Sequence, residues 1–277
     1  DLLDFLSPPD GPPPPTAAAK FGDSKAPYPG PILRKVRGHG TGGVIYKGGA
    51  WRHWPDVMWQ NVYMDTAWVK KKGAAVWRGV TTGCRDCWPQ TLTPRKEDDP
   101  RHGLERAEGG YGSRANLVRL WWDYSDRSKI DVAVTKYVQG VKDLYGVGSY
   151  MTKSDMMAHK MIIVAEGNDV ATGLKWAMLS ESAVIMTRPS VSSWMMEEML
   201  VPGVHYIEVQ EGWGDLEDKV NWCRANDEEC REIGRRGRCW MEMFFGEEEA
   251  KMAREVVERA VEMQGDCRDN RSEMQST

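Results

Sequence analysis

A cation, hydroxyl groups and glycines follow one another where an apolar run of the sequence ends. Arg78 and Gly79 lie in the run AAVWRGV, and Thr81, Thr82 and Gly83 come directly after it. Such residues suit a phosphate group, because glycine lets backbone N–H groups approach and arginine offers a planar fork of donors. The alternative is a surface turn with one solvated arginine. The residues alone leave both interpretations open.

A second group of candidate ligand-binding residues follows a later apolar run. The run MIIVAEG leads into Glu166, Gly167, Asn168 and Asp169, and then into a stretch with helical periodicity. The N-terminus of that helix would point unpaired N–H groups and a positive dipole end at a ligand, which suits a diphosphate. Alternatively, Asn168 or Asp169 serves only as the helix N-cap. Gly173 is unusual inside a helix and indicates close packing or the close approach of a ligand.

The cysteines indicate neither a disulfide scaffold nor a clear metal site. Only Cys84 and Cys87 form a CxxC pair, and Cys223, Cys230 and Cys239 are spread at longer spacings through a helical stretch. A structural zinc site normally needs a second close pair. We therefore favour spectator thiols over a redox pair, and a redox pair over zinc. The common motifs of dinucleotide-binding proteins, P-loop NTPases, GxSxG hydrolases and zinc proteases are absent.

The composition is that of an ordinary globular chain. Its 277 residues, 41% hydrophobic and 28% charged, allow one large or two modest domains and exclude general disorder. No run is long and apolar enough to span a membrane. The net charge of −4 gives no field to hold nucleic acid. The sequence starts without an initiator Met or a signal-peptide pattern, so the compartment stays open between the cytoplasm and the secretory lumen.

Short apolar runs alternate with helical periodicity from Ala74 onward, which is typical of βαβ units. Strands are predicted at 74–80, 130–135, 161–167, 183–187 and 205–210, and helices at 114–124, 154–160, 170–182, 193–200 and 216–234. The alternation predicts an α/β fold with a parallel, doubly wound sheet. Ligands of such sheets bind outside the carboxyl ends of the strands, where both groups of candidate residues lie.

From Ala74 to Met241 the sequence resembles glycosyltransferase family 90, which contains fungal capsule-associated xylosyltransferases and protein O-glucosyltransferases. The resemblance lies in AAVWRGVTTG, in RANLVRLW with IDVAVT, in the long stretch HKMIIVAEGNDVATGLKWAMLSESAVIMTRPSVSSWMMEEMLVPGVHYIEVQ, and in GDLEDKVNWCRANDEECREIGRRG. The segment EGNDVATGLKW is typical of the microbial, algal and viral branch of the family. The resemblance implies a GT-B-like architecture, with two Rossmann-type halves facing a cleft and a UDP-sugar in the C-terminal half.

Three parts of the chain are expected on this basis. Residues 1–73, with a Pro-rich segment within 7–31, would form a reduced N-terminal domain on the acceptor side. Residues 74–245 would form the Rossmann-like donor domain, with an irregular insertion at 84–112. Residues 246–277 would form an amphipathic helix that crosses back to the first domain, followed by a polar tail.

The resemblance also assigns candidate residues for binding the UDP-sugar. Arg114 matches the arginine that reaches the diphosphate in the family, and the loop before Lys175 matches the phosphate and ribose loop. Many members have an arginine where this chain has Gly173, so we expect Thr172, Lys175 and the helix N-terminus to replace that phosphate ligand. The candidate donor-site residues are Arg78, Gly79, Thr81, Thr82, Arg114, Glu166, Gly167, Asn168, Asp169, Val170, Ala171, Thr172 and Lys175.

The implied reaction inverts the anomeric centre of the sugar and uses no bound metal or cofactor. A carboxylate must take the proton from the acceptor hydroxyl, while cationic and N–H donors stabilise the departing UDP. Similarity to the family's Asp-x-Pro element assigns the base to Asp10, with Asp23, Asp56 and Asp65 as competitors. The alternative is that Asp10 only starts a Pro-rich turn.

The sequence therefore predicts a transferase that moves xylose, or glucose, from a UDP-sugar to a hydroxyl of a glycan or glycoprotein. Xylose is favoured because the sequence has no KDEL-like ending, which would mark a luminal glucosyltransferase. The competing hypotheses are a catalytically silent nucleotide-sugar-binding module and a UDP-sugar hydrolase or epimerase of the same architecture. Neither a nucleic acid partner nor a transmembrane segment is expected.

Overall fold

The computed structural model describes residues 65–83 and 113–244, together with residues 19–20, 33–34, 37–38, 44–45, 251, 255, 258 and 259. The chain divides into two compact units. The larger unit comprises Asp56–Pro189 and Leu200–Glu242, and the smaller unit comprises Asp1–Pro55, Ser190–Met199 and Met243–Thr277. Among the described residues, no helix has both the length and the apolar character that crossing a membrane requires.

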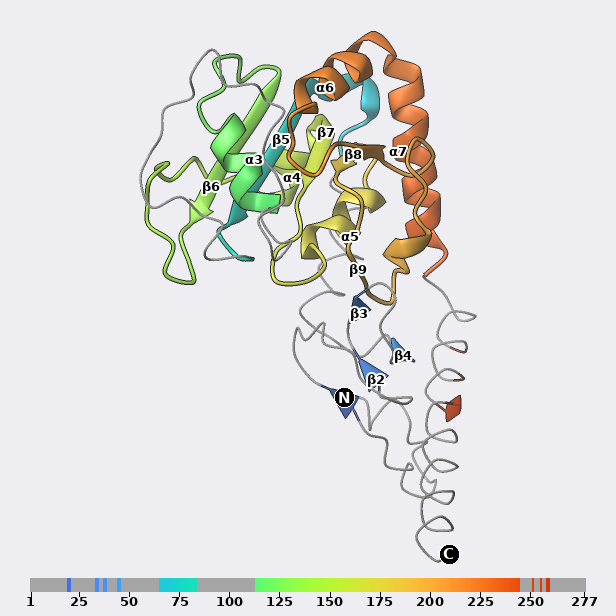
Figure 1. Cartoon of the computed structure of the whole chain (residues 1–277). Coiled ribbons are helices and arrows are strands. Elements are labelled where there is room, and N and C mark those ends of the chain that lie inside the picture. The colour runs from blue at the N-terminus through green and yellow to red at the C-terminus, as the bar shows by residue number, and fades with distance from the viewer. Residues whose placement is uncertain are drawn as a thin grey trace, which may run out of the picture. The chain divides into compact units, whose positions relative to one another are not determined.

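The larger unit is built on a five-stranded parallel sheet (Figure 1). The strand order is β10-β8-β7-β5-β6, and each neighbouring pair is parallel. The α/β fold with a Rossmann-like parallel sheet is therefore confirmed, and each of the five predicted strands has a counterpart. The strands are β5 (Lys72–Val80), β6 (Ile130–Lys136), β7 (His159–Val164), β8 (Ala183–Met186) and β10 (Ile207–Glu208).

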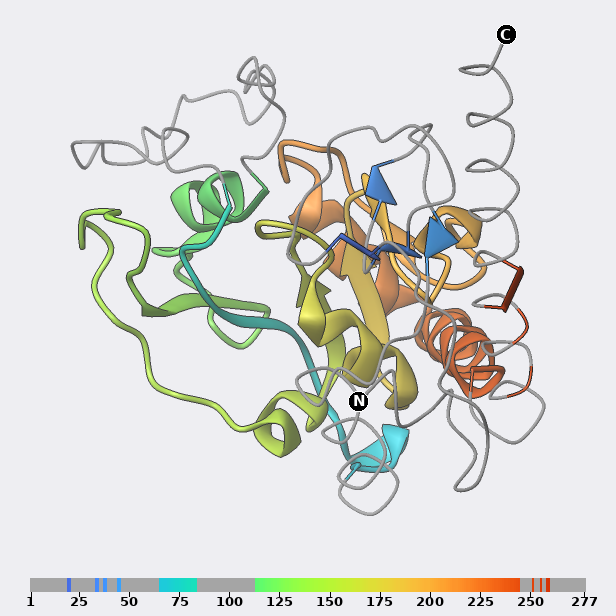
Figure 2. The same cartoon turned by 90° about the horizontal axis from the view of Figure 1, so that it is seen from below.

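Helices cover both faces of this sheet (Figures 1 and 2). Trp77 of β5 belongs to the same buried cluster as Leu117 and Val220, which lie on two of these helices. The alternate residue Val76 points to the other face and is equally buried, as a doubly covered parallel sheet requires. The helical elements of this unit are η1 (Trp68–Lys70), α3 (Ser113–Trp121), α4 (Lys153–Met157), α5 (Thr172–Leu179), α6 (Leu216–Ala225) and α7 (Asp227–Glu242).

The prediction of a helix at residues 193–200 is wrong. This segment holds only a 3-10 turn, η2 (Glu197–Met199), directly after a short strand, β9 (Val191–Ser192). The Glu197 carboxylate accepts hydrogen bonds from the backbone N–H (2.6 Å) and the hydroxyl (2.7 Å) of Ser193, which closes the turn between β9 and η2. Met196 has a φ of 54°, a left-handed conformation that interrupts a helix.

The helix predicted at 216–234 is two helices, α6 and α7. Asn226 lies between them with φ −119° and ψ 55°, outside the helical region. The carbonyl of Trp222 accepts hydrogen bonds from both the backbone N–H (2.8 Å) and the side-chain amide (2.9 Å) of Asn226, which closes the C-terminus of α6. The chain therefore turns at Asn226 and begins α7 at the next residue.

The smaller unit contains two short sheets among its described residues. Strands β1 (Ala19–Lys20), β2 (Leu33–Arg34) and β4 (Val44–Ile45) are parallel in that order, and β3 (Arg37–Gly38) pairs antiparallel with β9. Asp10, Asp23, Asp56, the Cys84–Cys87 pair and the insertion at 84–112 lie outside the described residues. The GT-B arrangement of two Rossmann-type halves and the three-part division of the chain stay predictions.

Candidate active site

The strand order places a switch point of the sheet between β5 and β7. The chain leaves β5 to form β6 on one side, and then returns to form β7 on the other side of β5. Sheets of this order bind ligands outside the carboxyl ends of the two strands that flank the switch point. Thr82 follows β5 and Glu166 follows β7. The two groups of candidate residues found in the sequence therefore meet at the ligand-binding edge of the sheet.

Arg114, in the first turn of α3, links the ends of these two strands. Its Nη1 donates to the carbonyl of Val80 (3.0 Å) and to Oγ1 of Thr82 (2.6 Å), and its Nε donates to the carbonyl of Ala165 (3.1 Å). Burial lowers the pKa of Arg114 to about 10, and the charge of Asp169 opposes that shift. The guanidinium is therefore still a cation near neutral pH. Among the described residues no hydrogen bond uses its Nη2, which leaves two N–H donors for a ligand.

Gly167 lies directly against this guanidinium. A Cβ at this position would be 3.1 Å from Cζ and 3.2 Å from Nη2 of Arg114, and 2.7 Å from Oγ1 of Thr82. A side chain would thus push apart the contact between Arg114 and Thr82. The close approach of Arg114 accounts for the glycine, and it leaves the backbone at this point uncovered by a side chain of its own.

Asn168 joins the loops that follow three strands. Its Oδ1 accepts hydrogen bonds from the backbone N–H of Gly83 (3.0 Å) and from Nε2 of Gln139 (3.1 Å). Oε1 of Gln139 also accepts from the N–H of Gly83 (3.2 Å). Gly83 has a φ of 118°, which residues with a side chain rarely adopt. Asn168 therefore holds the loops after β5, β6 and β7 in a fixed relation.

The N-cap role considered for Asn168 or Asp169 is wrong, because α5 begins later than predicted. The N-cap of α5 is Ala171, which offers no side-chain hydrogen bond. Within the described part of the chain, no side chain therefore caps the first N–H groups at the positive dipole end of α5. Thr172, the first residue of the helix, is exposed.

The remaining residues of this loop are mostly buried. Val170 and Ala171 pack into the core, so only their backbone could contact a ligand, and the side chain of Lys175 is also buried. At Gly173 the nearest atom to an added Cβ would be Nε1 of Trp176, at 3.5 Å, which is ordinary contact. Packing within the described protein therefore does not require this glycine.

The structure does not bring Arg78 to the switch-point group. Arg78 lies within β5, and its side chain is only 8% exposed. Its Nη2 forms an ion pair with Oδ2 of Asp131 (2.6 Å), Nη1 donates to the Asp131 carbonyl (3.1 Å), and Nε donates to the carbonyl of Ser149 (2.9 Å). These bonds fasten β5 to β6 and to the loop that follows β6. These bonds explain why a buried arginine stands at position 78, and they need no ligand.

Gly79 and Thr81 also have structural contacts. A Cβ on Gly79 would lie 2.4 Å from the indole of Trp77, so the glycine makes room for that ring. The Thr81 hydroxyl donates to the carbonyl of Val138 (3.1 Å) and accepts from the Val138 N–H (2.8 Å). Of the candidate residues predicted at the first strand end, Thr82 is thus the one whose side chain contacts Arg114.

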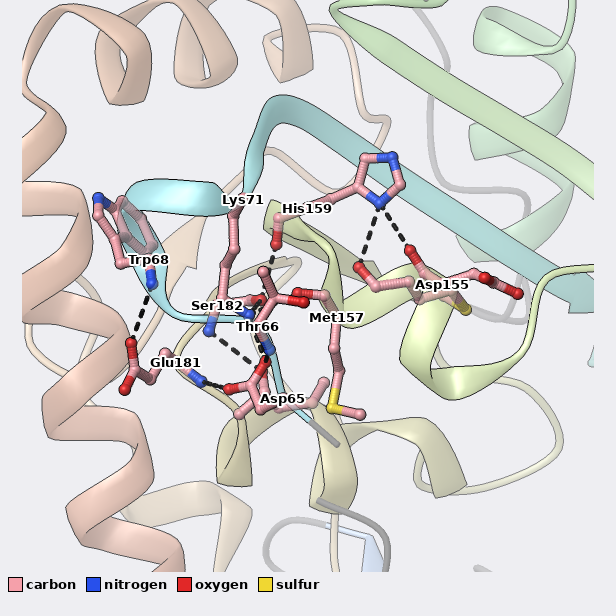
Figure 3. Close-up of polar contacts among 12 residues, drawn as sticks. Asp65, Thr66, Trp68, Lys71, Asp155, Met157, His159, Glu181 and Ser182 are labelled. Atoms are coloured by element: carbon pink, nitrogen blue, oxygen red, sulfur yellow. Dashed lines mark hydrogen bonds and ion pairs between the residues drawn. The ribbon is translucent and has the colours of Figure 1, made fainter. Parts of the chain in front are cut away.

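A buried polar network lies at the amino ends of the strands, opposite the carboxyl ends where ligands bind (Figure 3). Nζ of Lys71 forms an ion pair with Asp65 and donates to the Met157 carbonyl (2.5 Å) and to Oγ of Ser182 (3.0 Å). Oδ2 of Asp65 accepts from the N–H of Glu181 (2.6 Å). Asp65, a competing candidate for the catalytic base, is therefore engaged at the amino ends of the strands, away from the ligand-binding edge.

Sequence reasoning missed both Gln139 and Lys71. Gln139 offers no local signal, because its contact with Asn168 depends on the way that two loops meet. Lys71 is the middle one of three consecutive lysines at the start of β5, and this place next to a buried strand was the available signal that one of them is buried. No three His, Cys, Asp or Glu side chains are grouped to hold a metal ion within the described part of the chain. Metal independence stays a prediction.

Comparison with known proteins assigns the chain to a family. The model of "Glycosyl transferase family 90" matches residues 107–252, which is more than half of the 277 residues. "O-glucosyltransferase LpsA" of Dichelobacter nodosus is 36% identical over 95 residues, which cover 34% of this chain and 30% of the relative. "Protein O-glucosyltransferase 3" of Homo sapiens is 28% identical over 127 residues, which cover 45% of this chain and 24% of the relative.

A viral protein is similar over a longer stretch. "Uncharacterized protein 179R" of Invertebrate iridescent virus 6 is 25% identical over 201 residues, which cover 66% of this chain and 16% of the relative. In each of these three comparisons the match spans less than a third of the relative's length. The stretch of this chain that the family model matches includes Arg114 and the whole loop after β7. The chain belongs to glycosyltransferase family 90.

Proposed function

We propose that this chain carries the donor site of a glycosyltransferase that moves a sugar from UDP to a hydroxyl group. Membership of family 90 and the names of two relatives, both O-glucosyltransferases, support a glycosyl transfer activity. The single observation that carries the location of the site is the Arg114 guanidinium at the switch point, with Nη2 available beside Gly167.

The diphosphate is proposed to lie between Arg114 and the N-terminus of α5. A buried cation and uncapped helix N–H groups offset the negative charge of a diphosphate, and the low local dielectric strengthens both interactions. Each charge-assisted hydrogen bond contributes about 1.5–3 kcal/mol. The hydroxyls of Thr82 and Thr172 and the ammonium of Lys175 are proposed as further phosphate donors.

The ribose is assigned to the carboxylates of the loop after β7. Ionised carboxylates accept hydrogen bonds from ribose hydroxyls in sheets of this kind, at a strand end near the switch point. Glu166 and Asp169 are the two carboxylates of this loop, and the charge of Asp169 already acts on Arg114. Backbone groups from Gly167 to Ala171 complete the proposed contacts with the nucleotide.

The proposed reaction is a single displacement with inversion. The acceptor oxygen attacks C1 of the sugar while the bond from C1 to the phosphate oxygen breaks, and a carboxylate takes the proton of the acceptor hydroxyl. Arg114 and α5 stabilise the charge that develops on UDP, so that no metal is needed. The base is proposed to be Asp10 by its similarity to the family's Asp-x-Pro element.

The donor is proposed to be UDP-glucose or UDP-xylose, and the acceptor a glycan or glycoprotein hydroxyl. The names of the relatives favour glucose. The two sugars differ by one hydroxymethyl group, which a pocket discriminates by only about 10–200-fold, so both donors must be compared quantitatively.

Two buried arginines provide a matched test of the donor site. Titration calorimetry with UDP should show that Arg114→Lys weakens binding by about tenfold or more, because lysine keeps the charge but loses the planar fork. Arg78→Lys breaks a comparable buried arginine network and should leave UDP affinity within about twofold. If circular dichroism shows that both variants are folded and both lose UDP affinity equally, Arg114 is not part of the UDP site.

Activity assays separate the transferase from its competitors. UDP release from UDP-glucose or UDP-xylose should depend on an added acceptor. Acceptor-independent release would indicate a hydrolase. UDP binding without turnover of either donor would indicate the silent binding module, which the glycine at position 173 would then help to explain.

A further inference from the structure

A groove of about 840 Å³ lies along β10, the edge strand of the sheet. Its floor is formed by Ile207 and Val209 of the β10 segment and by Ile233 of α7, and Trp222 of α6 lines it as well. Strand β8 separates β10 from β7, so none of the residues assigned to the UDP site lines this groove. The groove is therefore a separate place on the larger unit.

Trp222 presents the largest exposed apolar surface in the groove. Trp222 is 39% exposed, although tryptophan is usually buried. The aliphatic residues of the floor, Ile207, Val209 and Ile233, are at most 5% exposed. A stable protein partner would need about 800 Å² on each side and several apolar anchors. One flat indole face suits a small ring-shaped ligand instead.

The rim of the groove consists of hydrogen-bonding groups whose charges nearly offset one another. Asp218 is exposed on α6. Asp215 forms an ion pair with Lys219 (3.7 Å), and Glu208 forms one with Arg188 (3.2 Å). Arg188 lies outside the lining, but with Lys219 it pairs two of the three lining carboxylates, so the groove has no strong field to hold a polyanion or a polycation. It offers carboxylate oxygens that accept hydrogen bonds and an ammonium that donates them.

A sugar ring combines the two properties that this lining recognises. One face of the ring carries C–H groups that pack on an aromatic surface, and its edge carries hydroxyls that both donate and accept hydrogen bonds. We propose that the groove along β10 binds a neutral carbohydrate chain, with one sugar ring stacked on Trp222 and its hydroxyls bonded to Asp218 and Lys219. Binding there does not depend on the proposed UDP site.

An array of immobilised oligosaccharides tests this proposal directly. The probes are neutral glucans, xylans, mannans and galactans, with sulfated and sialylated glycans and a basic peptide as comparisons. The wild-type chain should retain at least one neutral oligosaccharide in preference to the charged probes. Trp222→Ala and Asp218→Ala should each weaken that binding by about tenfold or more. Trp222→Phe, which keeps an aromatic face, should retain part of the affinity.

Tyr150 provides a matched control, because it is an aromatic residue that is 79% exposed and does not line the groove. Tyr150→Ala should bind the retained oligosaccharide as the wild type does, and an excess of UDP should leave that binding unchanged. If a variant that has lost UDP binding still binds the oligosaccharide, the oligosaccharide binds in the groove and not in the proposed donor site. The proposal would be overturned if the wild-type chain retained no neutral oligosaccharide or preferred the basic peptide. It would also be overturned if Trp222→Ala bound the retained oligosaccharide as tightly as the wild type does.

Discussion

The ion pair between Lys71 and Asp65 makes the strongest prediction about stability. The Lys71 side chain is fully buried, and Asp65 is 11% exposed. Lys71→Met would leave the carboxylate buried without its cation, and removing one partner of a buried pair costs about 3–5 kcal/mol. Asp65 would retain the N–H donors of Thr66 (2.8 Å) and Glu181 (2.6 Å), so we expect the lower end, about 3 kcal/mol.

Urea denaturation followed by circular dichroism measures this cost. The exposed pair of Arg238 and Glu242 on α7 is the matched control, and Arg238→Met should cost less than about 1 kcal/mol. Replacing both buried partners, in Lys71→Met with Asp65→Leu, should recover at least half of the loss, because no unpaired charge remains. A cost of less than about 1 kcal/mol for Lys71→Met would refute the reasoning.

The pH dependence of stability follows from the same residue. Burial lowers the pKa of Lys71 below its ordinary value of 10.5, although the hydrogen bond and the charge of Asp65 oppose that shift. Between the folded pKa and 10.5 the unfolded chain binds the proton and the folded chain does not, so the contribution of Lys71 to stability rises with pH in that window. Asp65→Asn removes the opposing influence and should start this rise at a lower pH. Urea midpoints measured from pH 7 to 10 should show that earlier rise, and identical profiles would contradict it.

Three further predictions concern the proposed donor site. Gly167→Ala should weaken UDP binding in calorimetry by about tenfold or more, because its Cβ would displace Arg114 and Thr82; unchanged affinity would show that this contact does not shape the site. Gly173→Ala should raise the free energy of unfolding by about 0.4–1 kcal/mol, since the added Cβ has room; a simultaneous loss of UDP affinity would show that a ligand, and not the protein, requires the glycine. EDTA should leave acceptor-dependent UDP release unchanged, and restoration of lost activity by a divalent cation would contradict the metal-independent mechanism.

The sheet could be predicted from the sequence because its strands carry a strong local signal. The stretch MIIV of β7 is continuously apolar, as a strand buried on both faces requires, and IDVAVT of β6 buries every second residue, as a strand at the edge of the sheet does. The segment 193–200 misled the same reasoning. Its apolar spacing is helical, yet Met196 has a left-handed backbone conformation that a right-handed helix cannot contain.

The candidate site was only partly predictable for a different reason. Arg78 lies within β5 and Arg114 in the first turn of α3, and the roles of both depend on partners far away in the sequence. Asp131, 53 residues after Arg78, accepts a hydrogen bond from Arg78 Nη2. The hydrogen bonds of Arg114 to the described residues leave its Nη2 available for a ligand. Gln139 contributes to the site only through the contact of two loops. Local pattern carries no information about such pairings.

The most direct measurement is a crystal structure of the chain with bound UDP. The account predicts that the diphosphate lies outside the carboxyl ends of β5 and β7, with a phosphate oxygen within hydrogen-bond distance of Arg114 Nη2 and close to the first N–H groups of α5. UDP bound elsewhere on the chain, with Arg114 contacting only Val80, Thr82 and Ala165 as it does now, would contradict the central claim.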